Sequence, residues 1–167
     1  MATMQVTLDT NAIISTWKKE PQTDACRRIE ALARQGRIHL GVASNVDFDD
    51  DRGWVVRWLT RATREGWLTE VAAIRRREYL NEAAPTPIDA DPALEQAIMR
   101  CLYPVDRRPW ERLRRSKQMD VDHLLSHRMN ERDVFVTGDK GILRKADCLK
   151  GLGITVMAPG DFVTTFR

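Results

Sequence analysis

A chain of 167 residues is long enough for one domain with a sizeable apolar core. Its hydrophobic fraction of 43% is ordinary for a soluble globular protein, and no apolar run approaches the roughly 18 to 20 residues that a membrane span needs. The net charge of +3, from 27 basic and 24 acidic residues, is too small to indicate nucleic-acid binding by itself.

The first half of the chain predicts strands that alternate with helices. The apolar residues from Met4 to Leu8 are typical of a buried first strand. Apolar residues then recur at helical spacing until Gly36, which predicts a helix that stops there. The predicted elements are, in order, strand 4–8, helix 23–35, strand 38–43, a helix marked by Trp54, Val55, Trp58, Leu59 and Ala62 that ends near Gly66, and a short strand within 67–74.

The middle of the chain, about 75–118, is interrupted by prolines and predicts only one helix, at 90–102. It holds too few apolar residues for a core of its own, so we expect one domain over 1–167 with this segment as an elaboration. The last third predicts helix 120–131, strand 134–137, helix 140–149, strand 154–157 and a closing turn at 159–161. This alternation predicts an α/β fold with three layers, α/β/α, around a mainly parallel sheet.

Aspartates stand at the ends of several predicted strands. Asp9 follows the first strand, and Asp139 follows the strand that ends at Thr137. The carboxyl ends of parallel strands meet at one edge of a sheet, so these side chains are expected to lie together. Asp120 can join them if its helix begins beside that edge. The second strand is followed by a run of four acids, Asp47, Asp49, Asp50 and Asp51.

Carboxylates that converge in this way repel each other unless a cation lies between them. Hard oxygen ligands select Mg²⁺ or Mn²⁺, and the open positions of such ions suit phosphate oxygens. The aspartates therefore predict a metal site that acts on a phosphodiester.

Three segments give the chain a resemblance to a known family. They are Val6-Thr7-Leu8-Asp9-Thr10-Asn11-Ala12-Ile13-Ile14, Asp120-Val121-Asp122-His123-Leu124-Leu125, and Asp133-Val134-Phe135-Val136-Thr137-Gly138-Asp139-Lys140-Gly141-Ile142-Leu143. The chain resembles the PIN domain family, the nuclease fold of toxins of type II toxin–antitoxin systems and of many RNA-processing nucleases. The resemblance covers both ends of the chain well and the middle poorly.

The resemblance implies a PIN-like fold and metal-dependent hydrolysis of RNA. It implies that Asp9, Asp120 and Asp139 coordinate Mg²⁺ or Mn²⁺, that Asn11 orients Asp9, and that Thr137 hydrogen-bonds near the metal. The family's second acid is usually a Glu a few residues beyond a Ser; here Ser44 is followed by aspartates. Asp50 is the first choice for that ligand and Asp49 the second.

Other functions compete with the nuclease. The alternative within the resemblance is a non-catalytic PIN-like module that binds RNA or protein. A phosphatase with Asp9 as its nucleophile would need a second Asp two residues on, where Asn11 stands. The family includes both toxins and housekeeping nucleases, so an antitoxin protein and a second copy of the chain stay open as partners beside the RNA substrate.

Each motif also has a structural interpretation. The acidic run is typical of a solvated loop or helix cap, Asp120 of an N-cap, Asp122 of a solvent-facing acid in a first turn, and Asp139 of a turn residue. His123 and His127 share a helical face, but the residues between them lack the Glu of a zinc-protease helix, so packing or hydrogen-bonding roles are expected.

Aromatic and basic residues predict surfaces and contacts. Trp54 and Trp58, at helical spacing, indicate core packing or a dimer interface. Trp110 lies among basic residues and fits either RNA stacking or surface anchoring. The basic stretch that surrounds it is predicted to track a phosphate backbone without reading sequence, and it comprises Arg107, Arg108, Arg112, Arg114, Arg115 and Lys117.

The three cysteines, Cys26, Cys101 and Cys148, are widely spaced and contain no CxxC pair. We expect reduced, buried or half-buried thiols and neither a disulfide nor a structural zinc site. The N-terminus lacks the apolar region of a signal peptide, which makes a cytoplasmic location the expectation.

Overall fold

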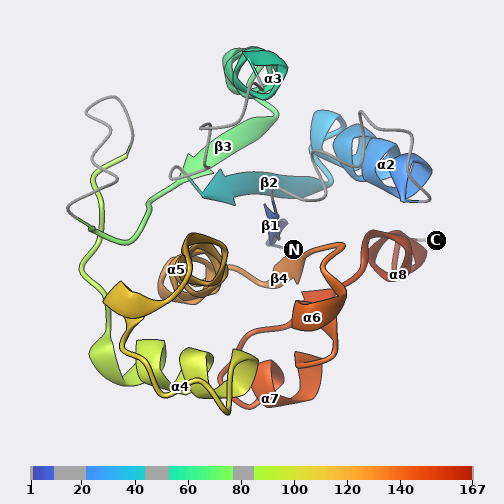
Figure 1. The fold of residues 1–167 in the computed structure, drawn as a ribbon. Helices are drawn as coiled ribbons and strands as arrows, with labels where there is room; N and C mark the ends of the chain where they lie inside the picture. The colour runs from blue at the N-terminus through green and yellow to red at the C-terminus, as the bar shows by residue number, and fades with distance from the viewer. Residues whose placement is uncertain (1, 10–21, 44–52, 77–84, 167) are drawn as a thin grey trace.

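A central sheet of five parallel strands organises the molecule, in the order β3-β2-β1-β4-β5 (Figure 1). The computed structural model describes residues 2–9, 22–43, 53–76 and 85–166. The strands are β1 (Met4–Leu8), β2 (Ile38–Ala43), β3 (Leu68–Val71), β4 (Val134–Val136) and β5 (Val156–Met157). The predicted α/β class with a parallel sheet and helices on both faces is confirmed.

The helices form two groups, one on each face of the sheet (Figure 1). The first group packs on one apolar cluster and consists of α2 (Thr23–Arg34), α3 (Gly53–Arg64) and α8 (Pro159–Thr164). The second packs on the other cluster and consists of α4 (Pro92–Leu102), the 3-10 helix η1 (Trp110–Arg112), α5 (Arg115–Met129), α6 (Lys140–Leu143) and α7 (Ala146–Lys150). Apolar residues of the middle segment therefore share a core with α5 and β4.

Side chains of a single strand contribute to both apolar clusters, because successive side chains point to opposite faces of the sheet. Val134 and Val136 belong to the cluster under α2, whereas Phe135 between them belongs to the cluster under α5. On α2 the residues Ile29 and Leu32 are buried on one face, and the helix gives way to a turn in which Gly36 has a φ of 69°. The sequence patterns thus fix both the faces and the ends of these elements.

Several boundaries differ from the sequence expectations. The predicted helix 140–149 is two short helices, α6 and α7, and the predicted closing turn at 159–161 is the start of helix α8. The third strand ends at Val71, and Ile74 forms only an isolated parallel bridge with Ile88. Helix α5 begins at Arg115, five residues before Asp120, because Gln118 and Met119 are buried and extend its packing face.

Arg132 links the neighbouring strands β1 and β2. Its Nε donates to Thr7 Oγ1 at 2.9 Å, and its Nη2 donates to the carbonyl oxygens of Val6 at 2.7 Å and His39 at 2.8 Å. A Cβ atom at Gly41 would lie only 2.7 Å from that Nη2. The glycine leaves the space through which the guanidinium passes. In the part of the chain described, no helix is long and apolar enough to span a membrane.

Candidate functional site

The connections of the sheet diverge between β1 and β4. From β1 the chain moves outward through β2 to β3, whereas β4 leads to β5 on the opposite side. In open parallel sheets such a switch point leaves a crevice beyond the carboxyl ends of the two strands, where ligands bind. Asp9 directly follows β1, and Thr137 to Asp139 directly follow β4. The strand order therefore brings two of the predicted acids to one crevice.

Thr137 connects the two acids. Asp9 is 5% exposed and Thr137 is fully buried. The backbone N–H of Asp9 donates to Val136 O at 2.9 Å, and Thr137 Oγ1 donates to Asp9 Oδ2 at 2.6 Å. The same Oγ1 accepts from the N–H of Asp139 at 3.0 Å. One hydroxyl thus fixes the direction of one carboxylate and the start of the segment that carries the other.

Asp139 caps helix α6. Its Oδ1 accepts hydrogen bonds from the N–H groups of Gly141 at 2.7 Å and Ile142 at 3.1 Å. These bonds hold the side chain at the carboxyl end of β4, where the first N–H groups of α6 favour a negative charge. The sequence suggested a metal ligand or a turn residue at this position; in the structure Asp139 is the N-cap of α6, and this cap holds the carboxylate at the same edge as Asp9.

Asp120 reaches the site from α5, but not from the start of the helix. Because α5 begins at Arg115, Asp120 is not its N-cap. Its Oδ2 accepts a 2.8 Å hydrogen bond from the hydroxyl of Tyr103, the residue that follows α4. Burial is the main cause that raises the pKa of Asp120 to about 6; the Tyr103 bond opposes it, and the negative charges of Asp9 and Asp139 add to it. Asp120 is therefore within electrostatic range of both acids.

Two neighbours of the acids were not expected from sequence as site residues. Tyr103 is half-buried, and burial followed by the charge of Asp120 raises its pKa, so its hydroxyl stays a donor. His123 is buried, and its Nδ1 lies 3.7 Å from Asp9 Oδ1. The spacing of His123 and His127 suggested packing or hydrogen bonding but not a contact with Asp9, and no local pattern marks Tyr103, since Tyr103 and Asp120 are 17 positions apart and His123 and Asp9 are more than a hundred apart. Only the fold brings them together.

His127, on the same helix, has a structural role, as predicted. Its Nδ1 is 2.8 Å from Thr7 Oγ1, and its ring meets Phe135 edge to face. Thr7 Oγ1 already accepts from Arg132, so the threonine hydroxyl can give its own hydrogen to the imidazole. Burial lowers the pKa of His127 to about 3, and the charge of Arg132 contributes. A neutral ring results.

Asp122 and Trp110 correct two sequence interpretations. Asp122 is not solvent-facing; it is fully buried and forms a 2.9 Å ion pair with Arg76, which also bonds Glu95. Trp110 is 8% exposed and lies under the same guanidinium, whose carbon is 3.8 Å from the ring centroid. It is therefore neither a platform for RNA bases nor a surface anchor. The partner of Asp122 is 46 residues away, beyond any local pattern.

The basic stretch extends from the residues before α5 into the first turn of that helix. Asp106 holds two of its members, Arg108 through a 2.7 Å ion pair and Lys117 through one of 3.0 Å. The remaining members lie on the surface between α4 and the first turn of α5, and they are Arg107, Arg112, Arg114 and Arg115.

Trp58, predicted for the core or an interface, is half-buried and meets Trp67 edge to face at 5.4 Å.

Part of the predicted site lies outside the described residues. This applies to Asn11 and to the acidic run, Asp47, Asp49, Asp50 and Asp51. Within the described ranges, no group of three or more His, Cys, Asp or Glu side chains is arranged to hold a metal ion. The oxygen-only donors Asp9, Asp120 and Asp139 nevertheless fit Mg²⁺ chemistry, because Mg²⁺ keeps several waters and is commonly held by one or two carboxylates together with substrate phosphates.

The cysteines depart from expectation. Cys101 in α4 and Cys148 in α7 form a disulfide, with their Cα atoms 5.8 Å apart, whereas Cys26 is buried and takes no part in it. Sequence reasoning missed the pair because 47 positions separate the two residues.

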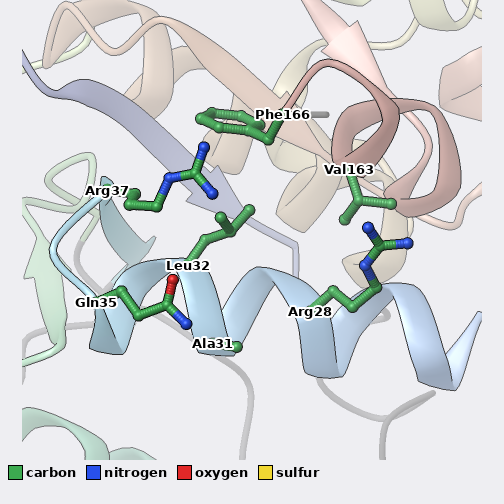
Figure 2. Close-up of a pocket in the computed structure, with 7 residues that line it drawn as sticks. All are labelled: Arg28, Ala31, Leu32, Gln35, Arg37, Val163 and Phe166. Atoms are coloured by element: carbon green, nitrogen blue, oxygen red, sulfur yellow. The ribbon is translucent and has the colours of Figure 1, made fainter.

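A pocket of about 210 Å³ lies elsewhere, between α2 and α8. Figure 2 shows the guanidinium groups of Arg28 and Arg37 beside Leu32, Val163 and Phe166. None of the predicted site residues lines this pocket. Its positive side chains do not suit a divalent cation, so the acidic crevice is the candidate site for the predicted chemistry.

Comparison of the chain with protein-family models, with curated proteins and with solved structures finds no match.

Proposed function

We propose that this chain is a PIN-like, Mg²⁺- or Mn²⁺-dependent ribonuclease that hydrolyses RNA phosphodiester bonds at Asp9, Asp120 and Asp139. The observation that carries the proposal is that Asp9 and Asp139 follow adjacent parallel strands at the switch point and are linked through Thr137, while their negative charges help to raise the pKa of Asp120. A set of mutually repelling carboxylates in a crevice is stabilised by a divalent cation. The same crevice is where open parallel sheets bind their ligands.

The residues have separate roles in this proposal. Asp9, Asp120 and Asp139 would hold the ion, Thr137 would orient Asp9 through its hydroxyl, and Asp50, or else Asp49, would supply a fourth carboxylate. When bound, the ion lowers the pKa of a water ligand and offsets the negative charge that develops on the phosphate. The basic stretch before α5 would bind the RNA backbone through its exposed arginines.

A non-catalytic PIN-like module that binds RNA or protein is the second candidate. The observation in its favour is that the described residues contain no group of three ligands arranged for a metal. A role as the toxin of a type II toxin–antitoxin system, an antitoxin partner, a homodimer and a cytoplasmic location remain predictions that accompany the nuclease proposal.

Cleavage of a fluorescently labelled single-stranded RNA, with Mn²⁺ or with a chelator, separates the two candidates. We expect Mn²⁺-dependent cleavage that Asp9→Asn and Asp139→Asn abolish. Asp133→Asn is the matched control, because Asp133 is an exposed acid at the opposite end of β4 whose Oδ2 accepts from the N–H of Gln5, a bond that Asn can also accept. RNA binding without cleavage, unchanged by Asp9→Asn, would favour the non-catalytic module.

A further inference from the structure

A continuous set of contacts joins the disulfide to the acidic crevice. Cys101 is 7% exposed and sits in the last turn of α4. Two residues later, Tyr103 ends the helix, with its N–H donating to Met99 O at 2.8 Å. The hydroxyl of Tyr103 then donates to Asp120 Oδ2 at 2.8 Å. The position of this donor therefore depends on where the end of α4 is held.

The other half of the disulfide belongs to the segment that follows Asp139. Asp139 caps α6, and α7, which carries Cys148, comes directly after α6. Ile142 of α6 and Leu149 of α7 are buried in the same cluster as Leu102 of α4. In Figure 1, α4 and α7 lie next to each other, with α5 between α4 and the sheet. The disulfide thus joins α4, the helix that Tyr103 follows, to α7, the helix that comes after the one capped by Asp139.

We propose, on the basis of the proposed function, that Tyr103 is a positioning residue for Asp120. The redox state of Cys101 and Cys148 then determines how firmly Tyr103 holds the Asp120 carboxylate for the metal. The oxidised chain is the form that binds metal tightly, and the reduced chain binds it weakly. Intracellular disulfides in most organisms are transient and commonly redox-sensing, so the bond is compatible with a cytoplasmic protein.

The redox step requires a dithiol as reductant. Its first thiolate attacks Sγ of Cys148, the exposed partner, and expels Cys101 as a thiolate, which takes up a proton. Its second thiolate then displaces Cys148, which is also protonated, and the reductant leaves as a disulfide. Two electrons and two protons pass to the protein, one S–S bond breaks and another forms.

Reduction is expected to loosen the site without unfolding the domain. Ile98 and Leu102 keep α4 anchored in the core whether or not the bond is present. The restraint that reduction removes acts at the end of the helix, where Tyr103 is held in place by its hydrogen bonds and by contact with Lys117, whose Nζ lies 4.5 Å from the ring centroid. Partners that orient a metal ligand typically contribute about ten- to a hundredfold in metal affinity.

The test measures the Kd for Mn²⁺ by titration calorimetry in the oxidised chain, the dithiothreitol-reduced chain, Tyr103→Phe and Cys148→Ser. We expect reduction, Tyr103→Phe and Cys148→Ser each to raise the Kd about tenfold or more. Cys148→Ser spares the buried cysteine and must no longer respond to dithiothreitol. Cys26→Ala, outside the disulfide, must respond like the wild type. Equal affinity of the oxidised and reduced wild type within about twofold overturns the proposal.

Hydrogen exchange of the metal-free protein gives a second readout that separates this inference from the proposed function. Reduction should speed exchange in peptides that cover residues 99–106 and 115–124, and leave β1 and β2 unchanged. If the oxidised wild type bound no Mn²⁺, the nuclease proposal would fail, and the positioning of Asp120 by the disulfide would be judged on exchange alone. Unchanged exchange in both peptides on reduction overturns it.

Discussion

Thr137 donates a 2.6 Å hydrogen bond to the carboxylate of Asp9, and this bond joins the carboxyl ends of β4 and β1. Both groups are buried, so the bond is made in surroundings that exclude water. It connects two strands that are more than a hundred residues apart in sequence, at the place where the connections of the sheet diverge. The acidic crevice and the stability of the central strands therefore depend on the same contact.

Thr137→Val should destabilise the domain by about 1–3 kcal/mol, because an oxygen of the buried Asp9 loses its donor while the shape of the side chain is kept. Chemical denaturation measures this difference. Thr165→Val is the control: its hydroxyl donates to Phe162 O within the last turn of α8, and it should cost less. Equal destabilisation of the two variants would show that the bond to Asp9 has no special weight.

Millimolar Mg²⁺ or Mn²⁺ should raise the thermal midpoint of the chain, since a ligand that binds only the folded state stabilises it by about 2.7 kcal/mol at a hundred times its Kd. Asp9→Asn and Asp139→Asn should each abolish the gain, and Asp133→Asn should retain it. The measurement is a thermal scan with and without metal. A wild-type midpoint that does not respond to metal would count strongly against the site.

The stabilising contribution of Asp120 to the metal-free chain should fall as pH rises from about 4 to 6, while His127, whose pKa is lowered to about 3, contributes with the opposite sign over the same interval. Asp120 has a folded-state pKa of about 6 against 3.8 in the unfolded chain, so the folded state binds more protons within that interval. Asp120 contributes its full stabilising free energy at pH values below its unfolded-state pKa. This contribution is lost as the pH rises through the folded-state pKa, and it amounts to on the order of 1.4 kcal/mol for each unit by which the two pKa values differ. Urea unfolding at several pH values measures the slope.

Asp120→Asn should remove that contribution, so the difference in the free energy of unfolding between the wild type and the variant should fall over the same pH interval; the contributions of His127 and Asp122 are common to both proteins and cancel. The same titration predicts weaker Mn²⁺ binding below pH 6, where a proton competes for Asp120. A slope that is identical in wild type and Asp120→Asn would contradict the assignment.

The acidic run after β2 should contain one residue that matters for cleavage. Asp50→Asn is expected to impair the reaction far more than Asp47→Asn or Asp51→Asn, because only Asp50 is predicted to bind the metal. Initial rates at saturating RNA and Mn²⁺ measure the effect. Small, equal effects in all variants would mean that three acids suffice, and a dominant effect of Asp49→Asn would move the ligand by one position.

Replacement of Arg112, Arg114 and Arg115 together by Ala should raise the Kd for RNA and flatten its dependence on salt, by roughly 0.7 in slope for each phosphate of a single strand that the protein no longer neutralises. The rate at saturating RNA should survive. Fluorescence anisotropy at several salt concentrations gives both the Kd and the slope. Arg27, Arg57 and Arg64, exposed on α2 and α3, form the matched control triple. Unchanged affinity and slope would refute the basic stretch as a binding track.

Local patterns predicted the strands and the acids that follow them, because alternation of apolar residues and the ends of apolar runs are properties of neighbouring residues. Asp9 and Asp139 reach one edge simply because parallel strands align their carboxyl ends. The start of α5 was misplaced because Arg114 to Lys117 read as a charged surface segment, which hid the buried face of Gln118 and Met119. That shift also turned Asp122 from a solvent-facing acid into a buried one.

The remaining features depend on pairs that are distant in sequence. Arg76 contacts Asp122, Tyr103 contacts Asp120, and Cys101 is bonded to Cys148. The tertiary fold brings each of these pairs together. The identities of the residues do not indicate these partners, because each pair is brought together by the packing of segments that are distant in sequence. The sequence therefore predicted the candidate carboxylates but not the side chains that contact them.

Gly41 and Arg132 form a single steric unit. Any Cβ at position 41 would press on the guanidinium that links the backbones of β1 and β2, and on Val71 of the neighbouring strand at 2.6 Å. A side chain at position 41 would therefore displace the end of the Arg132 side chain, at the expense of its hydrogen bonds to both strands, and would also require Val71 to move. Arg132 can be shortened while Gly41 is kept, but Gly41 cannot gain a side chain without disturbing Arg132, although the two positions are more than ninety residues apart and neither belongs to the acidic crevice.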